Sequence, residues 1–108
     1  MTPEPSLTIS TRHVPAGPVL ALAGDLDHAT AGSLRTALDT LALAPGQALT
    51  LDLTALGFCD SSGITVLLAA HSRAHAQAAE FILSNVPPAT ARILNLLGLT
   101  EILLPWRR

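Results

Sequence analysis

The sequence predicts a single α/β domain built on a mixed, mostly parallel β-sheet. Short apolar segments with strand-like alternation are separated by longer segments with helical spacing, and Gly- or Pro-containing turns mark the boundaries. A helix between two strands implies a crossover connection and therefore a parallel pair. With 108 residues, 49% hydrophobic and 13% charged, the chain can fill one continuous core and is too apolar for disorder.

The first two strands are expected to form an antiparallel hairpin at one edge of the sheet. Residues 1–5 are expected to lie outside the fold. Apolar and polar residues alternate from Leu7 to Val14, as in a half-buried edge strand. The turn Pro15-Ala16-Gly17-Pro18 leads into a more buried strand from Val19 to Ala23, which ends at Gly24-Asp25-Leu26-Asp27.

A first helix and a third strand follow. The helix begins between Asp27 and Thr30, either of which can cap it, and Pro45-Gly46 stops it. Apolar residues at helical spacing form its buried face: Ala31, Leu34, Ala37, Leu38 and Leu41. The third strand spans Ala48 to Thr54.

The second half of the chain continues the alternation of helix and strand. A long helix is predicted from Ser61 to Ala79, and its buried stripe comprises Ile64, Leu67, Leu68, His71 and Ala74 or His75. A fourth strand spans Glu80 to Ser84. Pro87-Pro88 opens a third helix that runs to Leu97 and closes at Gly98, and Leu99 to Leu104 form a short strand or extended tail.

Composition excludes several classes of function. All six basic residues are arginines, so a Walker-type phosphate loop, a Schiff base and a lysine general base are absent. A net charge of -2 and a pI near 6.0 do not favour nucleic-acid binding. The single cysteine, the acidic and proline-containing N-terminus and the lack of a bilayer-length apolar run indicate a cytoplasmic protein without membrane insertion.

The strongest candidate site is Asp60-Ser61-Ser62-Gly63, at the junction of a predicted strand and a predicted helix. The simple interpretation is that Asp60 or Ser61 caps the helix. One residue suffices for a cap, however, which leaves the second serine free at a helix N-terminus, where negative charge is tolerated. A phosphoryl group on that serine would add about -1.5 to -2 of charge.

Asp25 and Asp27 follow a neighbouring strand and are expected at the same edge of the sheet. Turn formation and helix capping explain them equally well. If they lie near Ser62, their charge would increase the difference between its phosphorylated and free forms. Replacing both by Asn would then weaken the dependence of partner binding on phosphorylation.

Other chemistries fit less well. His71 and His75 lack a third ligand, so no metal site is predicted. Cys59 is interpreted as a small buried residue. Asp52 superficially resembles the phosphoacceptor of a receiver domain, but that site needs a nearby lysine and the chain has none, so Asp52 is interpreted as a carboxylate on a strand face. A serine hydrolase needs a histidine base within reach of the serine, and only His28 in the neighbouring loop keeps that alternative open.

Three segments carry a resemblance to a known family: GDLDHATAGSLRTAL (Gly24 to Leu38), LTLDLTALGFCDSSGITVLL (Leu49 to Leu68) and ATARILNLLGL (Ala89 to Leu99). The chain resembles the STAS-domain anti-sigma factor antagonists. The resemblance implies one STAS-like domain over residues 1–108, with four to five strands, three helices and a C-terminal helix that is short or absent. It departs from the family at its short C-terminal end and at Gln77-Ala78-Ala79-Glu80, where a glycine is common.

The resemblance also implies a function and a set of partners. Ser62, or less readily Ser61, is the residue phosphorylated by an anti-sigma factor that is an ATP-dependent serine kinase. The unphosphorylated form binds that kinase and frees a sigma factor. The phosphorylated form does not bind, and a metal-dependent serine phosphatase converts it back to the unphosphorylated form. The protein is then a substrate rather than an enzyme, it needs no cofactor, and it is expected to be a monomer or weak dimer.

The predicted partner-binding residues gather on the loop around Asp25 and on the start of the long helix. They are Asp25, Asp27, His28, Thr30, Asp60, Ser61, Ser62, Gly63, Ile64 and Val66. The alternative is a STAS subunit that regulates a transporter or a signalling complex through the same surface without phosphorylation.

Overall fold

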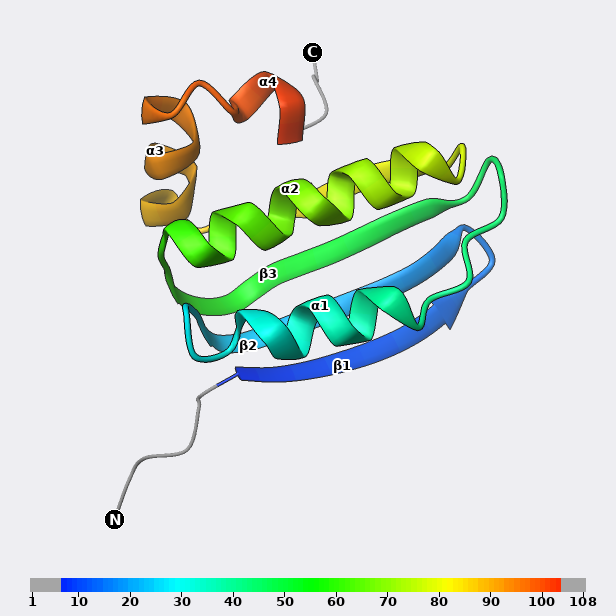
Figure 1. The fold of residues 1–108 in the computed structure, drawn as a ribbon, viewed down its shortest axis with the longest axis horizontal. Helices are drawn as coiled ribbons and strands as arrows, with labels where there is room; N and C mark the ends of the chain where they lie inside the picture. Colours follow the sequence, from blue (N-terminus) through cyan, green and yellow to red (C-terminus); the bar gives the residue numbers. More distant parts are fainter. Residues whose placement is uncertain (1–6, 104–108) are drawn as a thin grey trace.

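The computed structural model describes residues 7–103 and contains a four-stranded sheet in the order β1-β2-β3-β4. β1 (Leu7–Val14) and β2 (Gly17–Leu26) form the antiparallel hairpin, and β3 (Ala48–Cys59) lies beside β2 (Figure 1). β3 pairs parallel with β2 on one side and with β4 (Glu80–Ser84) on the other. The predicted mixed, mostly parallel sheet is therefore confirmed. The expectation for residues 1–5 falls outside the described residues.

The helices α1 (Ala31–Asp39) and α2 (Ser61–Ala76) cover the same face of the sheet (Figure 1). This is what two right-handed crossovers in the same direction along a sheet produce. The chain then forms α3 (Pro88–Leu96) and a single turn of helix, α4 (Thr100–Leu103). The described part of the chain thus has four helices, of which the last is short.

The strand or extended tail predicted from Leu99 was wrong within the described residues. The backbone N–H groups of Ile102 and Leu103 donate to the carbonyl of Leu99, at 3.1 and 2.9 Å. This turn places the side chain of Leu103 in the core, where it is 1% exposed. Leu104 and Trp106 lie outside the described residues.

The core between the sheet and the helices is built almost entirely from leucine. Among residues 7–103 it has no aromatic member, because the two phenylalanines are exposed or half-buried. The helix-facing side chains of β2 and β3 alternate with exposed or half-buried ones, as a sheet with one covered face requires. Its innermost members come from β2, β3, α1 and α2: Leu20, Leu22, Leu49, Leu51, Leu53, Leu34 and Leu67.

β3 is longer than the predicted strand, which stopped at Thr54. Its last residues pair with the end of β2, with Ala55 opposite Ala23 and Cys59 opposite Leu26. The pairing shifts register twice along this stretch. Bulges of this kind break the two-residue alternation by which a strand is recognised in a sequence. The extension carries the chain to the junction with α2.

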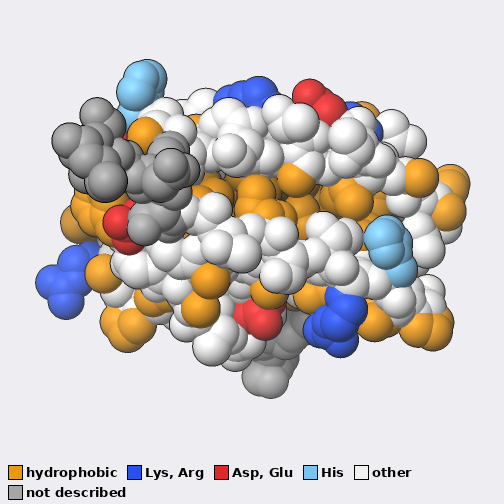
Figure 2. Space-filling model, turned by 90° about the horizontal axis from the view of Figure 1, so that it is seen from below, with side chains coloured by type: hydrophobic (Ala, Val, Ile, Leu, Met, Phe, Trp, Pro, Cys, Tyr) orange, Lys and Arg blue, Asp and Glu red, His pale blue; other side chains and the backbone are white. Residues whose placement is uncertain are grey.

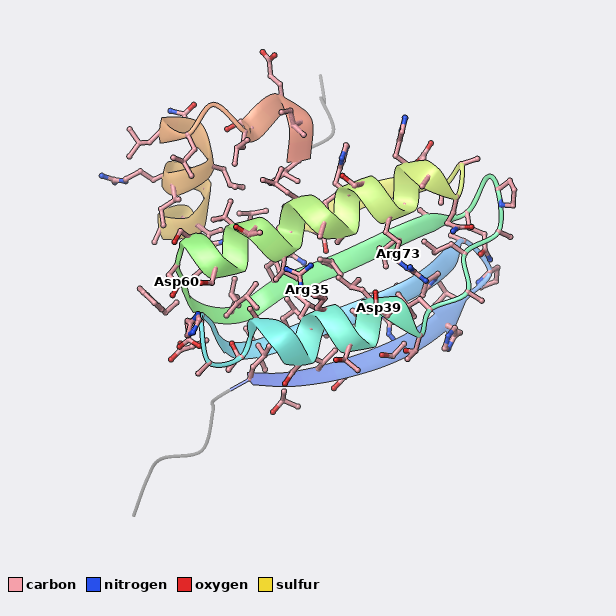
Figure 3. The ribbon with its side chains drawn as sticks, in the orientation of Figure 1. Arg35, Asp39, Asp60 and Arg73 are labelled. Carbon is pink, nitrogen blue, oxygen red and sulfur yellow. The ribbon has the colours of Figure 1, made fainter. Side chains whose placement is uncertain are left out.

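α1 ends at Asp39, before the predicted stop at Pro45. Arg73 of α2 donates from Nη2 to the backbone carbonyls of Asp39 and Leu41, at 3.2 and 3.1 Å (Figure 3). The guanidinium group therefore satisfies carbonyls that a helix end leaves unpaired. It also ties the end of α2 to the end of α1.

α2 is buried over a wider arc than the predicted stripe. Val66 and Ala70 are fully buried together with the predicted Ile64, Leu67 and Ala74. His71 is half-buried with its ring edge-on to Phe81, and His75 is exposed. The wider arc reflects contacts of α2 with α1 on one side and α4 on the other.

The core reaches the surface along the β1 edge. Seen from below, hydrophobic side chains form a band across the middle of the molecule (Figure 2). Leu7 and Ile9 of β1 and Ala31 and Ala37 of α1 are partly buried and pack against the core.

No helix among residues 7–103 has the length and apolar character needed to cross a bilayer.

Candidate functional site

The Asp60-Ser61-Ser62-Gly63 segment lies at the carboxyl end of the parallel strands, where β3 passes into α2. Cys59 pairs with Leu26, and the backbone N–H of Asp60 donates to the carbonyl of Leu26 at 3.2 Å. The ends of β2 and β3 are therefore held side by side. Clefts and ligand sites of open α/β sheets form at this end of the strands.

Asp60 is the N-cap of α2. Its backbone is extended, with φ -102° and ψ -169°, and its Oδ1 accepts a hydrogen bond from the N–H of Gly63 at 3.1 Å. Its Oδ2 accepts from the N–H of His28 at 3.3 Å. The carboxylate of Asp60 (labelled in Figure 3) thus caps α2 and also holds the loop after β2 against the start of this helix.

Gly63 allows α2 to approach the sheet closely. A Cβ atom at this position would lie 2.6 Å from the carbonyl oxygen of Leu26 and 2.8 Å from Sγ of Cys59. Any larger residue would push the first turn of α2 away from β2. The glycine of the Asp-Ser-Ser-Gly segment therefore sets the position of the two serines relative to the neighbouring loop.

The serines occupy the first two positions of α2 and face outward to different degrees. Ser61 is exposed and Ser62 is half-buried. The carbonyl of Ser61 accepts a hydrogen bond from Oγ1 of Thr65 at 3.0 Å. Within residues 7–103, neither serine hydroxyl has a hydrogen-bond partner. Because Asp60 provides the cap, both hydroxyls remain available for other chemistry.

The loop from Asp25 to Thr30 is held by its own side chains. Oδ1 of Asp27 accepts from the N–H groups of Ala29 and Thr30, at 3.0 and 3.2 Å. Oγ1 of Thr30 accepts from the N–H of Asp27 at 2.9 Å and donates to the carbonyl of Asp25 at 2.8 Å. Thr30 precedes α1 without capping it through its side chain.

Asp25 reaches across to β3 instead of facing solvent freely. Its Oδ1 accepts from the N–H of Phe58 at 3.1 Å. The same oxygen would lie 3.0 Å from a Cβ on Gly57. The carboxylates of Asp25, Asp27 and Asp60 all bind backbone N–H groups, so each has a structural role beside any effect of its charge.

The structure brings the predicted partner-binding residues to one edge but divides them into two layers. His28 and Ser61 are exposed, and Asp25, Asp27, Asp60 and Ser62 are partly exposed. Thr30, Gly63, Ile64 and Val66 are buried, with Thr30 at 1% and Val66 at 0% exposure. The side chains of the second group support the surface from inside and do not form part of it.

The sequence interpretation missed Phe58, which is 55% exposed at this edge. It was overlooked because the third strand was predicted to end at Thr54. An aromatic residue in a chain with three of them, two positions before Asp60, was a signal that could have been used.

The other candidate residues have local explanations. Hydrogen bonds from the Thr54 hydroxyl and N–H and from Asn85 lower the pKa of Asp52. Burial, and to a smaller extent the Asp60 carboxylate, raises the pKa of the Cys59 thiol to about 11. The thiol is therefore protonated at neutral pH. Among the described residues, no three His, Cys, Asp or Glu side chains gather closely enough to hold a metal ion.

Comparison with known proteins places this geometry in context. A family model described as "Mlab, STAS domain" matches residues 9–105. A protein of Paenibacillus polymyxa named anti-sigma F factor antagonist is 29% identical over 99 residues, which are 91% of this chain and 85% of that protein.

Three solved structures combine similar folds with more than a quarter sequence identity. An anti-sigma factor antagonist from Mycobacterium paratuberculosis is 27% identical, with a TM-score of 0.80 over 98% of this chain and 92% of that one. The anti-sigma factor antagonist SpoIIAA in its unphosphorylated form is 27% identical, with a TM-score of 0.69 over 85% and 82% of the two chains. The Bacillus SpoIIAA in its phosphorylated form is 26% identical, with a TM-score of 0.62 over 85% of each chain.

Proposed function

Because the chain belongs to the STAS-domain family, we propose that it is an anti-sigma factor antagonist controlled by phosphorylation of Ser62. In this proposal the unphosphorylated protein acts in the cytoplasm and binds an anti-sigma factor that is also a serine kinase. Binding releases a sigma factor for transcription. Phosphorylation of Ser62 ends the binding, and a serine phosphatase restores it.

The observation that carries the proposal is the free serine pair at the N-terminus of α2. Asp60 caps the helix, so the hydroxyl of Ser62 is not needed for the fold. The helix dipole tolerates a phosphate at this position. The similarity to SpoIIAA, which has been solved in an unphosphorylated and a phosphorylated form, supports the same chemistry here.

Electrostatics explain how the modification would act. The unphosphorylated surface around Ser62 is compact, and its carboxylates are engaged with backbone N–H groups. A phosphoserine would add about -1.5 to -2 of charge beside them. A partner docked on this surface would have to desolvate that charge, and any acidic group it carries would be repelled.

The site provides no catalyst of its own in this proposal. His71 lies further along α2 and packs against Phe81, away from the serines. His28 contacts the site through its backbone N–H to Asp60. Ser62 is therefore a residue on which a kinase and a phosphatase act.

Phosphorylation by a purified partner tests the proposal. The protein is mixed with ATP and with each kinase-type anti-sigma factor encoded in the same genome, and the added phosphate is located by mass spectrometry. We expect labelling of the wild type and of Ser61→Ala, and none of Ser62→Ala. Labelling that is lost only in Ser61→Ala would move the site by one residue.

Two further outcomes would contradict the proposal. Absence of labelling and of binding with every such kinase would favour the alternative of a non-phosphorylated STAS subunit. Ester hydrolysis that disappears in Ser62→Ala would indicate a serine hydrolase. As a test of the charge effect, Ser62→Asp should bind the anti-sigma factor more weakly than Ser62→Ala.

A further inference from the structure

Phe58 is a large apolar side chain left in solvent at the edge that carries the serines. Four large hydrophobic residues of the described chain are strongly exposed, and the other three, Leu96, Leu97 and Ile102, lie on or next to α3 and α4. Phe58 is the one that belongs to the end of β3, two residues before the cap Asp60. The apolar residues nearest to it in sequence, Leu56 and Cys59, are by contrast buried, at 5% and 4% exposure.

The backbone that carries Phe58 is held in place from the neighbouring strand. Its N–H donates to Oδ1 of Asp25 at 3.1 Å, although the two residues are 33 positions apart in sequence. The Asp25 carboxylate also lies close over Gly57, where a Cβ would come within 3.0 Å of it. The next residue, Cys59, is paired with Leu26. Phe58 is therefore displayed from a fixed main chain.

An exposed aromatic ring on a fixed main chain is suited to binding. Aromatic residues are enriched in protein–protein interfaces relative to the remaining surface. A residue whose backbone is already positioned loses less conformational freedom on association than one on a mobile loop. The exposed residues His28 and Ser61 of this edge are polar, which matches an interface with one large apolar centre and a polar rim.

We propose that Phe58 is the apolar anchor on which the anti-sigma factor docks, and that Asp25 is the residue that positions it. This inference rests on the proposed function above. It predicts that the anti-sigma factor has an apolar pocket for Phe58, next to the part of its surface that binds Ser62. Phe58 then contributes binding to the partner and brings the kinase to the serine, while the chemistry of phosphoryl transfer remains the kinase's.

Binding measurements on four proteins test the anchor. The probe is any kinase-type anti-sigma factor of the same genome that binds the wild type, and its affinity is measured by calorimetry for wild type, Phe58→Ala, Phe58→Leu and Leu97→Ala. We expect a loss of about tenfold or more for Phe58→Ala, as truncation of an interface anchor produces. Phe58→Leu should be intermediate. Leu97→Ala removes an equally exposed apolar side chain elsewhere and should bind like the wild type.

The outcomes separate this inference from the proposed function. If the wild type binds and Phe58→Ala binds equally well, the anchor is refuted and the proposed function stands. If no such anti-sigma factor binds the wild type, both are refuted. Phe58→Ala should unfold at nearly the wild-type temperature, because the ring is mostly in water. A KM for phosphorylation that rises with an unchanged kcat is the expected kinetic counterpart.

A second series tests the role of Asp25. Asp25→Asn keeps an oxygen acceptor for the N–H of Phe58 and removes the charge, whereas Asp25→Ala removes both. If Asp25 acts through position, Asp25→Asn should bind nearly as the wild type, and Asp25→Ala should bind more weakly. Asp25→Ala should have little further effect in a Phe58→Ala background. Equal losses for Asn and Ala, or additive losses with Phe58→Ala, would show that Asp25 acts by its own charge and not through Phe58.

Discussion

At the carboxyl end of β2 and β3, three aspartate side chains accept hydrogen bonds from backbone N–H groups, whereas at the amino end of the parallel strands backbone carbonyls take most of that role. The carboxyl end uses Asp25, Asp27 and Asp60. At the amino end, the carbonyls of Ala16, Gln47 and Ala78 accept from Ala48, Glu80 and Gly46, at 2.7, 2.8 and 2.9 Å. The two ends solve the same problem, the pairing of backbone groups in loops, with different acceptors.

The difference separates stability from function. A backbone carbonyl at the amino end can accept such a hydrogen bond only where two segments of the chain come very close and adopt unusual backbone angles. Steric fit therefore determines the stability of this end. Carboxylate acceptors at the carboxyl end reach across loops and leave charge at the surface. Substitutions at the amino end should therefore change the free energy of unfolding without changing partner binding. Substitutions at the carboxyl end that disturb the contact between the Asp25–Thr30 loop and the start of α2 should change both.

The largest expected effect is that of Gly17→Ala at the amino end. Gly17 has φ +136°, and an added Cβ would lie 2.1 Å from the carbonyl oxygen of Ala48. Backbone strain and the steric clash together should cost about 3 kcal/mol of unfolding free energy, measured by urea denaturation. Partner affinity should be unchanged at temperatures where the variant is folded. A cost below about 1 kcal/mol would show that the turn relaxes freely.

Gly63→Ala is the matched substitution at the carboxyl end. The added Cβ would meet the Leu26 carbonyl at 2.6 Å, but the backbone is ordinary helix and gains about 1 kcal/mol of helix propensity from alanine. The net cost should be about 1–2 kcal/mol, smaller than at Gly17. Unlike Gly17→Ala, this variant should also lose partner affinity, because α2 must shift away from the Asp25–Thr30 loop.

Asp60→Ala should cost about 1 kcal/mol, as the loss of a helix N-cap does. Asp60→Asn retains a carbonyl oxygen that can accept from Gly63 and should cost only a few tenths of a kcal/mol. Neither variant can serve both Gly63 and His28 with two acceptor oxygens. Amide exchange at His28 should therefore accelerate in both variants, although only Asp60→Ala is clearly destabilised by denaturation. Unchanged exchange at His28 would contradict the link between the loop and α2.

The elements recognised from sequence were those whose ends have their own local signals. β1 and β4 were predicted with the boundaries observed. α3 begins at Pro88 and is closed by Gly98 at φ +72°, as the Pro and Gly positions predicted. The Asp-Ser-Ser-Gly segment was recognised because it too has a local signal: its residue types are typical of a helix start.

The features that were missed depend on contacts between distant segments. β3 continues past Thr54 because β2 pairs with it through two register shifts, which no local pattern reveals. Val66 is buried because α2 lies between two other helices, and Thr30 because its hydroxyl closes the loop from Asp25. The role of Asp25 requires knowledge that Phe58, 33 residues away, lies beside it.

An effect smaller than that of Asp60→Ala is expected at the ends of α2 and α3, which form the same closing motif with different residues. In α3, Gly98 adopts φ +72°, and the N–H of Leu99 bonds to the carbonyl of Leu94 at 2.8 Å. In α2, Ala78 takes the equivalent place at φ +59°, and the N–H of Ala79 bonds to the carbonyl of Ala74 at 2.9 Å. These are Schellman closures, in which glycine is favoured because it has no Cβ to strain.

Exchanging the two residues tests whether the left-handed angle alone sets the cost. Ala78→Gly should raise the unfolding free energy by about 0.5–1 kcal/mol, since relief of strain exceeds the added freedom of the unfolded chain. Gly98→Ala should lower it by a similar amount, because a Cβ at Gly98 would meet no atom within 4 Å and only the backbone angle is affected. Both are measured by urea denaturation. If Ala78→Gly were destabilising, the methyl group of Ala78 in the wild type would have to make a contact that outweighs the strain of the left-handed backbone angle. Because Ala78 lies at the amino end of β4, the partner affinity of Ala78→Gly should be unchanged whether the variant is stabilised or destabilised.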